Sequence, residues 1–276
     1  MAVITLLSDF GSKDPYVAEM KAVILSICPE TRIVDISHEI ETFDVHMGAF
    51  ILASAAPYFP QGTIHVGVVD PGVGTKRRPI IVEAEQGFYV GPDNGLLMLS
   101  ARKEGISHAY NISNPQYMRP EVSRTFHGRD IFAPAAAHLA KGHSPFEFGT
   151  EIHDYVLPKF AEPQLRNEGF LGEVLHIDCF GNIITNISVR DLEKIGACEG
   201  CLLHVELKDK VLDLKLCSAY GQVPAERALA IIGSSDFLEI SVNQANASQI
   251  FGVKTGDSVR ILLQSSNNRS SQRRGI

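Results

Sequence analysis

TIHVGVVDPGVGTKRRP, residues 63–79, is the stretch of this 276-residue chain that decides its fold. Its first seven residues are almost wholly apolar, which is typical of a strand buried on both faces of a parallel sheet. The strand ends at Asp70, and the Pro71–Gly72 pair that follows predicts a turn. A glycine-containing loop then leads to Arg77 and allows it to fold back toward Asp70. The stretch therefore predicts a buried strand with a charged pair at its carboxyl end.

Apolar runs and helical patterns alternate around this strand. The runs are VITLLSD (3–9), TRIVDIS (31–37), PIIVEAE (79–85) and GFYVGPD (87–93), and the helical patterns cover 16–27 and 43–56. Strands interleaved with helices predict an α/β, Rossmann-like domain over residues 1–155, with a mostly parallel sheet. Several strands are expected to end in Asp, at positions 9, 35, 70 and 93. Ligands of such sheets bind outside the carboxyl ends of the strands, so these residues point to a site.

The second half of the chain has a different pattern. Residues 156–169 are polar and contain prolines, which indicates a linker. Short alternating runs separated by turn residues follow, and they predict a smaller antiparallel β-barrel domain over residues 170–264. The final segment, 265–276, is polar and without period, which predicts disorder.

Composition and charge exclude several classes of function. The net charge is −7 and the pI about 5.8, which argues against a nucleic-acid-binding surface. No apolar run approaches the length of a membrane span, and the N-terminus does not resemble a secretory signal. We therefore expect a cytoplasmic protein. Five scattered cysteines do not suit a disulfide framework, so we expect them to be reduced. Cys198 and Cys201 form a lone C-x-x-C without the partners of a zinc site, for which a structural role is favoured.

Asp70, Arg77 and His127 are the candidate catalytic residues. Asp70 and Arg77 would form a charged pair at the ligand-facing edge of the sheet. His127 precedes the apolar helical pattern of RTFHGRDIFAPAAAHLA (124–140), and the start of that helix would open onto the same crevice. Two structural alternatives stay open: Asp70 could nucleate an Asx-turn, and His127 could cap a helix or lie in the core.

Further residues are suited to binding a nucleoside. Asp9 ends the first predicted strand, where a carboxylate can accept both ribose hydroxyls. Asp14 lies in the same loop, although it could equally be a helix N-cap before Pro15. Asp178, Phe180 and Asn182 stand together at one turn, which suits stacking on a purine and hydrogen bonding to it. A hairpin built on Gly181-Asn182 is the alternative there.

Eight motifs in one order give the chain a specific resemblance. They are SDFG, ICPE, VDISHEI, VDPGVGT-x-R, GPDNGLL, TFHGRDIFAP, IDCFGN with TNI, and SSDFLEISVNQ. The chain resembles the adenosine-forming S-adenosyl-L-methionine (SAM) hydrolases, also called SAM hydroxide adenosyltransferases, which are relatives of the fluorinase and chlorinase. The similarity implies an α/β domain followed by a β-barrel. It also implies a homotrimer with each site between the first domain of one subunit and the barrel of the next.

The resemblance implies that SAM is the substrate and that no metal or other cofactor takes part. Water would attack the ribose C5′ and release adenosine and methionine. Arg77 would stabilise hydroxide while Asp70 and His127 hold the water, and which of these two accepts the proton stays open. The implied substrate-binding residues are Asp9, Asp14, Phe43, Phe126, Asp178, Phe180, Asn182, Ser234, Glu239 and, through its backbone, Val242.

Two departures from the fluorinase concern the surroundings of the substrate. Ser235 stands where the fluorinase has an arginine, and Phe43 stands where it has a tryptophan. A halide-using adenosyl transferase of the same fold is one alternative function, but Asp70 would repel an anion. A non-catalytic sensor that binds SAM or adenosine is another. Neither alternative involves nucleic acid or a membrane.

Overall fold

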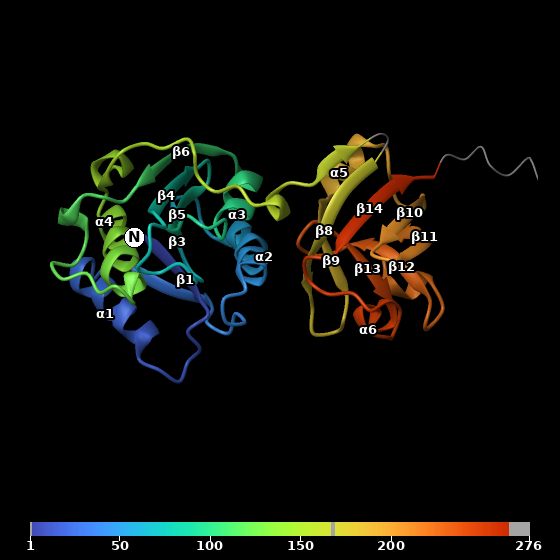
Figure 1. The fold of residues 1–276 in the computed structure, drawn as a ribbon, viewed down its shortest axis with the longest axis horizontal. Coiled ribbons are helices and arrows are strands. Elements are labelled where there is room, and N and C mark those ends of the chain that lie inside the picture. The colour runs from blue at the N-terminus through green and yellow to red at the C-terminus, as the bar shows by residue number, and fades with distance from the viewer. Residues whose placement is uncertain (1, 167–168, 265–276) are drawn as a thin grey trace, which may run out of the picture. The chain divides into compact units, whose positions relative to one another are not determined.

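The computed structural model describes residues 2–166 and 169–264. The chain divides into two compact units, Met1–Ala161 and a second that begins at Glu162 (Figure 1). The segment predicted as a linker is partly regular, because η5 (Lys159–Ala161) and β7 (Gln164–Arg166) lie in it. The tail predicted to be disordered, 265–276, lies outside the described residues.

The first unit is built on a six-stranded sheet with the order β2-β1-β3-β5-β4-β6. Pairing is parallel from β2 to β5, whereas β4 is antiparallel to both of its neighbours. The predicted α/β fold with a mostly parallel sheet is thus confirmed. Its strands are β1 (Val3–Ser8), β2 (Arg32–Ser37), β3 (Thr63–Val68), β4 (Pro79–Ala84), β5 (Gly87–Pro92) and β6 (Ile106–Asn111).

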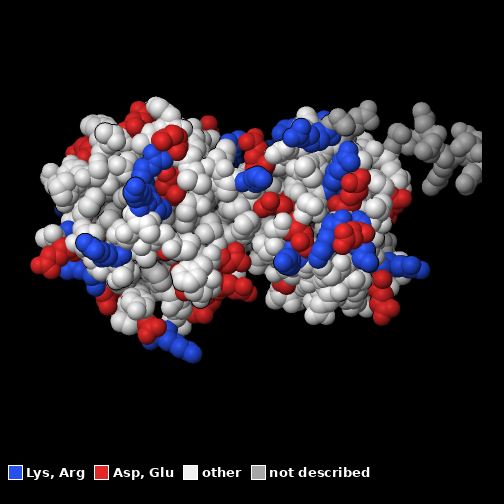
Figure 2. All heavy atoms as spheres, in the orientation of Figure 1, with Lys and Arg blue, Asp and Glu red and all other residues white. Residues whose placement is uncertain are grey.

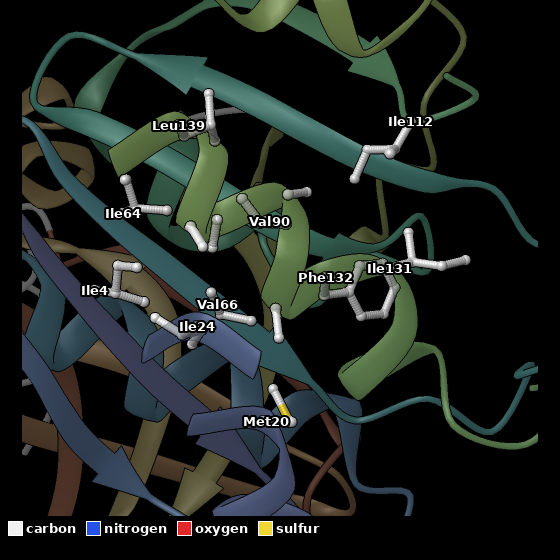
Figure 3. Packing of buried hydrophobic residues seen from close by; sticks show 14 of the residues in the cluster. Ile4, Met20, Ile24, Ile64, Val66, Val90, Ile112, Ile131, Phe132 and Leu139 are labelled. Carbon is white, nitrogen blue, oxygen red and sulfur yellow. The ribbon is translucent and has the colours of Figure 1, made fainter. Parts of the chain in front are cut away.

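Helices cover both faces of this sheet. Figure 1 shows α1 (Tyr16–Ile27) and α4 (Ala133–Ala140) on one face, with α2 (Val45–Ala55) and α3 (Met98–Glu104) on the other. Helix α1 spans the predicted range, and its N-cap is Pro15 rather than Asp14. The alanine-rich α4 presents little side-chain bulk, which allows α1 and the strands to pack closely against it. Figure 3 shows the resulting core, in which α1 and α4 side chains meet β1, β3 and β5.

Strands β1 and β3 position the site. All six residues of β3 are buried, as the apolar run predicted. The chain leaves β1 toward β2 on one side and leaves β3 toward the opposite side, so a crevice opens between their carboxyl ends. Asp9 and Asp70 follow these two strands. Asp35, by contrast, does not end a strand as expected: β2 continues to Ser37, and Asp35 pairs with Lys21 at 2.6 Å.

The second unit is a closed, mostly antiparallel barrel, as predicted. Seven strands follow one another in the order β14-β10-β11-β12-β13-β9-β8, and β14 pairs back to β8 to close the barrel. The β11–β12 pair is parallel, and β7 adds to the outside of β8. The barrel strands are β8 (Gly169–Ile177), β9 (Ile183–Ser188), β10 (Leu202–Leu207), β11 (Lys210–Cys217), β12 (Ala228–Ile232), β13 (Phe237–Val242) and β14 (Ser258–Leu263). The short helices are α5 (Val189–Lys194) and α6 (Ala247–Phe251).

Candidate active site

The first unit carries a pocket of about 380 Å³ at the carboxyl ends of β1 and β3. Polar groups line one part of it and aromatic rings another. The lining includes Asp9, Phe10, Tyr16, Phe43, Asp70, Phe126 and His127. Residues predicted from four separate stretches of sequence therefore meet in one cavity.

A buried charged cluster forms one wall of this pocket. Arg77 donates to both carboxylate oxygens of Asp70, from Nε to Oδ1 at 3.1 Å and from Nη2 to Oδ2. The same Nη2 lies 2.9 Å from Nδ1 of His127. The Asp70 and Arg77 side chains are only 6% and 7% exposed, and the guanidinium lies over the Phe132 ring at 5.4 Å. Arg77 itself is not among the lining residues, but it contacts Asp70 and His127, which are.

The loop after β3 brings Arg77 back to Asp70. The backbone carbonyl of Asp70 accepts from the N–H of Val73, so the turn does not use the Asp70 side chain and leaves it for Arg77. Gly74 has φ +73°, and a Cβ there would lie 2.2 Å from the carbonyl oxygen of Arg124. This close approach requires glycine. It fixes the loop against the segment that leads to His127.

The contact with Arg77 determines the tautomer of His127. A guanidinium can only donate, so Nδ1 of His127 must accept, and a neutral ring then carries its proton on Nε2. Burial and, next, the charge of Arg77 lower the pKa of His127. The imidazole is therefore neutral around pH 7 and presents Nε2–H as a donor.

A second ion network holds the segment that carries His127. The segment continues into η3 (Gly128–Phe132), a π-helical turn ahead of α4; such turns occur frequently at functional sites. Asp130 is fully buried and accepts from Arg129, from Arg119 and from the N–H of Ser123. Burial alone would raise the pKa of Asp130, but these hydrogen bonds and charges hold it below its ordinary value. The ionised Asp130 thus connects Arg119 and Ser123, which precede His127, with Arg129, which follows it.

Aromatic rings and Asp9 complete the first pocket. Phe10, Tyr16 and Phe126 form a mutually tilted trio with centroid separations of 5.2–5.7 Å. One Asp9 oxygen accepts from the N–H of Phe43 at 2.9 Å. Phe43 adopts φ +66°, which is uncommon for a residue other than glycine, and its side chain is exposed. Asp14 is exposed in the loop before α1 and is not among the residues that line the pocket.

The barrel carries a larger pocket, of about 810 Å³. The turn between β8 and β9 supplies Asp178, Phe180 and Asn182. The Asp178 carboxylate accepts from the backbone N–H groups of Phe180 and Asn182 and from the Asn182 amide. The hairpin alternative is confirmed, since β8 and β9 pair antiparallel around this turn. The same turn lines the pocket, and its role in binding stays a prediction. The lining further includes Tyr220, Ser234, Glu239, Val242 and Asn246.

Glu239 lines the barrel pocket and is buried. Tyr220 donates to Oε2 of Glu239 at 2.9 Å. Burial and, to a smaller extent, the charge of Asp178 raise the pKa of Glu239, while the bond from Tyr220 opposes them. A Cβ on Gly233 would lie 1.7 Å from Oε1 of Glu239, so glycine at 233 makes room for this carboxylate.

Sequence reasoning did not single out several lining residues, among them Phe10, Tyr16 and Tyr220. Phe10 belongs to the SDFG motif and follows Asp9 directly. Tyr16 begins α1 and follows Pro15. These neighbours were the only local signals that the two aromatic residues lie at the site. Tyr220 lies in the short turn η6 (Tyr220–Gln222), and nothing near it in the sequence indicates a site.

Groups of metal-binding side chains, membrane-spanning helices and surface charge are the features of the described residues that bear on metal, membrane and polyanion binding. Within residues 2–166 and 169–264, no three His, Cys, Asp or Glu side chains are grouped so that they could hold a metal ion. No helix in these ranges combines the length and apolar character needed to cross a bilayer. Figure 2 shows acidic and basic side chains interspersed over the face in view.

The fold and pockets define a two-unit α/β and β-barrel protein with a buried Asp–Arg–His cluster at the carboxyl edge of its sheet. Residues 4–149 match the family model of the SAM hydroxide adenosyltransferase N-terminal domain, and residues 172–260 match that of the C-terminal domain. The chain belongs to the SAM hydroxide adenosyltransferase family.

Individual relatives agree with this assignment. The chain is 38% identical over 261 residues to the (R)-S-adenosyl-L-methionine hydrolase of Salinispora tropica, which covers 94% of this chain and 97% of the relative. The solved structure of an uncharacterized conserved protein from Thermotoga maritima matches with a TM-score of 0.82 at 37% identity, over 95% of this chain and all of that one. The fluorinase of Nocardia brasiliensis is more distant, at 32% identity over 94% of this chain and 96% of the relative.

Proposed function

We propose that this protein hydrolyses SAM to adenosine and L-methionine. The observation that carries the proposal is the buried Asp70–Arg77–His127 cluster at the wall of a pocket in the fold of this family. Curated relatives at 35–38% identity are named (R)-S-adenosyl-L-methionine hydrolase.

The proposed step displaces a neutral leaving group by water. The water oxygen bonds to the ribose C5′ while the C5′–S bond breaks, and the bonding pair neutralises the sulfonium as methionine. The departing thioether needs no proton, so catalysis must act on the nucleophile. Hydroxide and sulfonium cancel their charges as they react, and a pocket that excludes water favours this change. Arg77 contacts Asp70 and His127 but does not line the pocket, so its positive charge stabilises the developing hydroxide at a distance.

The hydrogen bonds of the cluster divide the remaining roles between Asp70 and His127. If Nε2 of His127 were to accept the proton, Nδ1 would have to carry hydrogen and face the N–H of Arg77 at 2.9 Å, which is a donor–donor clash. The Asp70 oxygens keep lone pairs beyond those that bind Arg77. We therefore propose Asp70 as the proton acceptor and His127 as a donor that orients the water.

Both pockets contribute to substrate binding in this proposal. Asp9 binds the ribose in the first pocket, where Phe43 and Phe126 also contact the substrate. Asp14 contacts the substrate from the exposed loop before α1, outside the residues that line the pocket. Phe180 and Asn182 bind adenine in the barrel pocket, where Asp178 and Ser234 hold the amino-acid end and Glu239 and the Val242 backbone lie nearby. We further propose a homotrimer in which the barrel of a neighbouring subunit completes each site. The exposed Phe43 and Phe180 side chains, at 63% and 74%, support it, and a light-scattering mass tests it.

The direct test is to incubate the protein with SAM and follow adenosine and methionine by chromatography. We expect equimolar products, no adenosine from Asp70→Ala, and an unchanged rate from Asp35→Ala, whose carboxylate is ion-paired but outside the pocket. Binding of SAM without turnover would instead identify a sensor. Halogenated nucleoside in high chloride or fluoride would identify a halide-using transferase.

Two further properties are proposed on the same basis. The step uses side chains alone, so we expect a chelator such as EDTA to leave the rate unchanged. A cytoplasmic location stays a prediction from the sequence alone.

A further inference from the structure

The C-x-x-C pair lies at a turn of the barrel that the proposed reaction does not use. Cys198 and Cys201 come directly before β10, and their sulfur atoms are 2.9 Å apart. The Cys198 side chain is exposed and that of Cys201 is half-buried. The two thiols therefore touch each other at a position that small molecules in solution can reach.

Backbone hydrogen bonds hold the two cysteines in this arrangement. The N–H of Cys201 donates to the carbonyl of Cys198 at 3.0 Å, which closes a β-turn. The ends of a β-turn lie within about 7 Å, a separation of Cα atoms that a disulfide can span. Gly200 and Cys201 each exchange a backbone hydrogen bond with Leu216 of β11, at 2.7 and 2.9 Å. The turn is thus fixed to the barrel before any bond forms between the sulfurs.

Glu199, one of the two residues between the cysteines, adds a side-chain anchor. Glu199 accepts from the hydroxyl of Ser218 at 2.6 Å, and Gln222 in turn donates to that hydroxyl at 2.8 Å. These bonds connect the turn to the segment that follows β11. Because the backbone is held from two directions, closing a bond between the sulfurs requires little movement of the chain.

We propose that Cys198 and Cys201 form a redox-active dithiol that small-molecule disulfides convert into an intramolecular disulfide. One thiolate attacks the external disulfide and releases the first small thiol, which leaves a mixed disulfide on the protein. The second cysteine then attacks the protein sulfur and releases the second small thiol. The protein loses two electrons and two protons, and the external disulfide gains them.

The remaining cysteines provide the contrast that this proposal needs. Cys28 and Cys217 are buried, whereas Cys179 is exposed in another turn of the same barrel. An external disulfide can reach Cys179, but among the described residues no second thiol contacts it. Cys179 should therefore remain as a mixed disulfide, whereas Cys198 and Cys201 should go on to form an intramolecular disulfide.

The test uses the full chain in buffers that contain reduced and oxidised glutathione at a series of ratios. After rapid alkylation, peptide mass spectrometry measures the state of each cysteine. We expect the peptide with Cys198 and Cys201 to lose two hydrogens and to be restored by dithiothreitol, and the Cys179 peptide to carry glutathione. Cys198→Ser should retain glutathione on Cys201, and Cys179→Ser should leave closure unchanged.

Glu199→Ala tests the role of the anchored turn. We expect it to lower the equilibrium constant for closure by up to about tenfold, the scale of one lost hydrogen bond, with the barrel still folded by circular dichroism. Glutathione that stays on Cys198 or Cys201 of the unaltered chain would overturn the proposal. A pair that remains reduced at every ratio would do the same. The readout does not involve SAM, so it is independent of the proposed hydrolysis.

Discussion

The two pockets hold their carboxylates in different ways. In the first unit, Asp70 is locked into a buried ion pair by Arg77, which also holds His127. In the barrel, Asp178 is held by an amide and backbone N–H groups, and Glu239 by a tyrosine hydroxyl. A fixed charge beside a histidine suits bond making and breaking, whereas neutral donors and an exposed ring suit recognition. The contrast predicts that changes in the charged cluster of the first pocket act on kcat and changes in the barrel act on KM.

Asp70→Asn should have the largest effect on activity, through a loss of kcat. The amide keeps the shape of the side chain but cannot accept a proton from water, and it leaves the Arg77 charge unbalanced. We expect kcat to fall by about 10³-fold, within the range for loss of a general base, with KM nearly unchanged. Single-turnover release of adenosine measures this effect, and Asp35→Asn is the matched control. A loss that falls mainly on KM would mean that Asp70 binds substrate rather than activating water.

Asp130→Asn should have the largest effect on stability. It removes the buried negative charge that faces Arg119 and Arg129 and that accepts from Ser123. We expect the free energy of unfolding in urea to fall by roughly 3 kcal/mol, as for other broken buried ion pairs. Since the Asp130 pKa is lowered in the folded state, its contribution is present at neutral pH and is lost as the pH falls through that lowered pKa.

Asp35→Asn again provides the comparison for this variant. Its ion pair with Lys21 is partly exposed, so we expect a change below about 1 kcal/mol. Equal losses from the two variants would show that the Asp130 network does not hold the His127 segment more firmly than a surface pair would.

Phe180→Ala should act on the barrel pocket alone. Loss of a ring that stacks on a base typically costs about 1–3 kcal/mol, so we expect KM to rise about tenfold while kcat stays within about twofold. Phe146→Ala is the matched control, because Phe146 is similarly exposed, at 68% against 74%, but does not line either pocket. If Phe180→Ala instead lowered kcat and left KM alone, the proposed division between chemistry and recognition would be wrong.

Local patterns predicted the scaffold of the first pocket well. The apolar run of β3 ends at Asp70, and helical periodicity located α1, because both signals lie within a few residues of what they describe. Asp35 shows the limit of such signals. Alternating polarity cannot define the last residue of an edge strand, where one face meets solvent, and β2 runs two residues beyond Asp35.

Contacts between distant residues were beyond the reach of pattern alone. Arg77 and His127 are 50 positions apart. The topology of an open sheet indicated that they share a crevice, and the resemblance to a family assigned them to one catalytic set. Tyr220 gave no signal at all. It joins Glu239 because η6 leads into β12, which pairs with β13, and no short-range periodicity records that pairing. The hydrogen bond that fixes the His127 tautomer is likewise a property of the folded geometry.

The pH profile offers the finest test of the first pocket. Protonation of His127 would remove the lone pair that accepts from Arg77 and place two positive charges together. Because burial and Arg77 lower the pKa of His127, the neutral ring persists below the ordinary histidine range. We therefore expect kcat/KM to keep more than half of its neutral-pH value at about pH 6.5, the unperturbed pKa of histidine, and to fall about tenfold per unit at pH values below the lowered pKa. An acid limb centred at or above the unperturbed value would show that Arg77 does not control the histidine, and the barrel variant Phe180→Ala should leave the limb where it is.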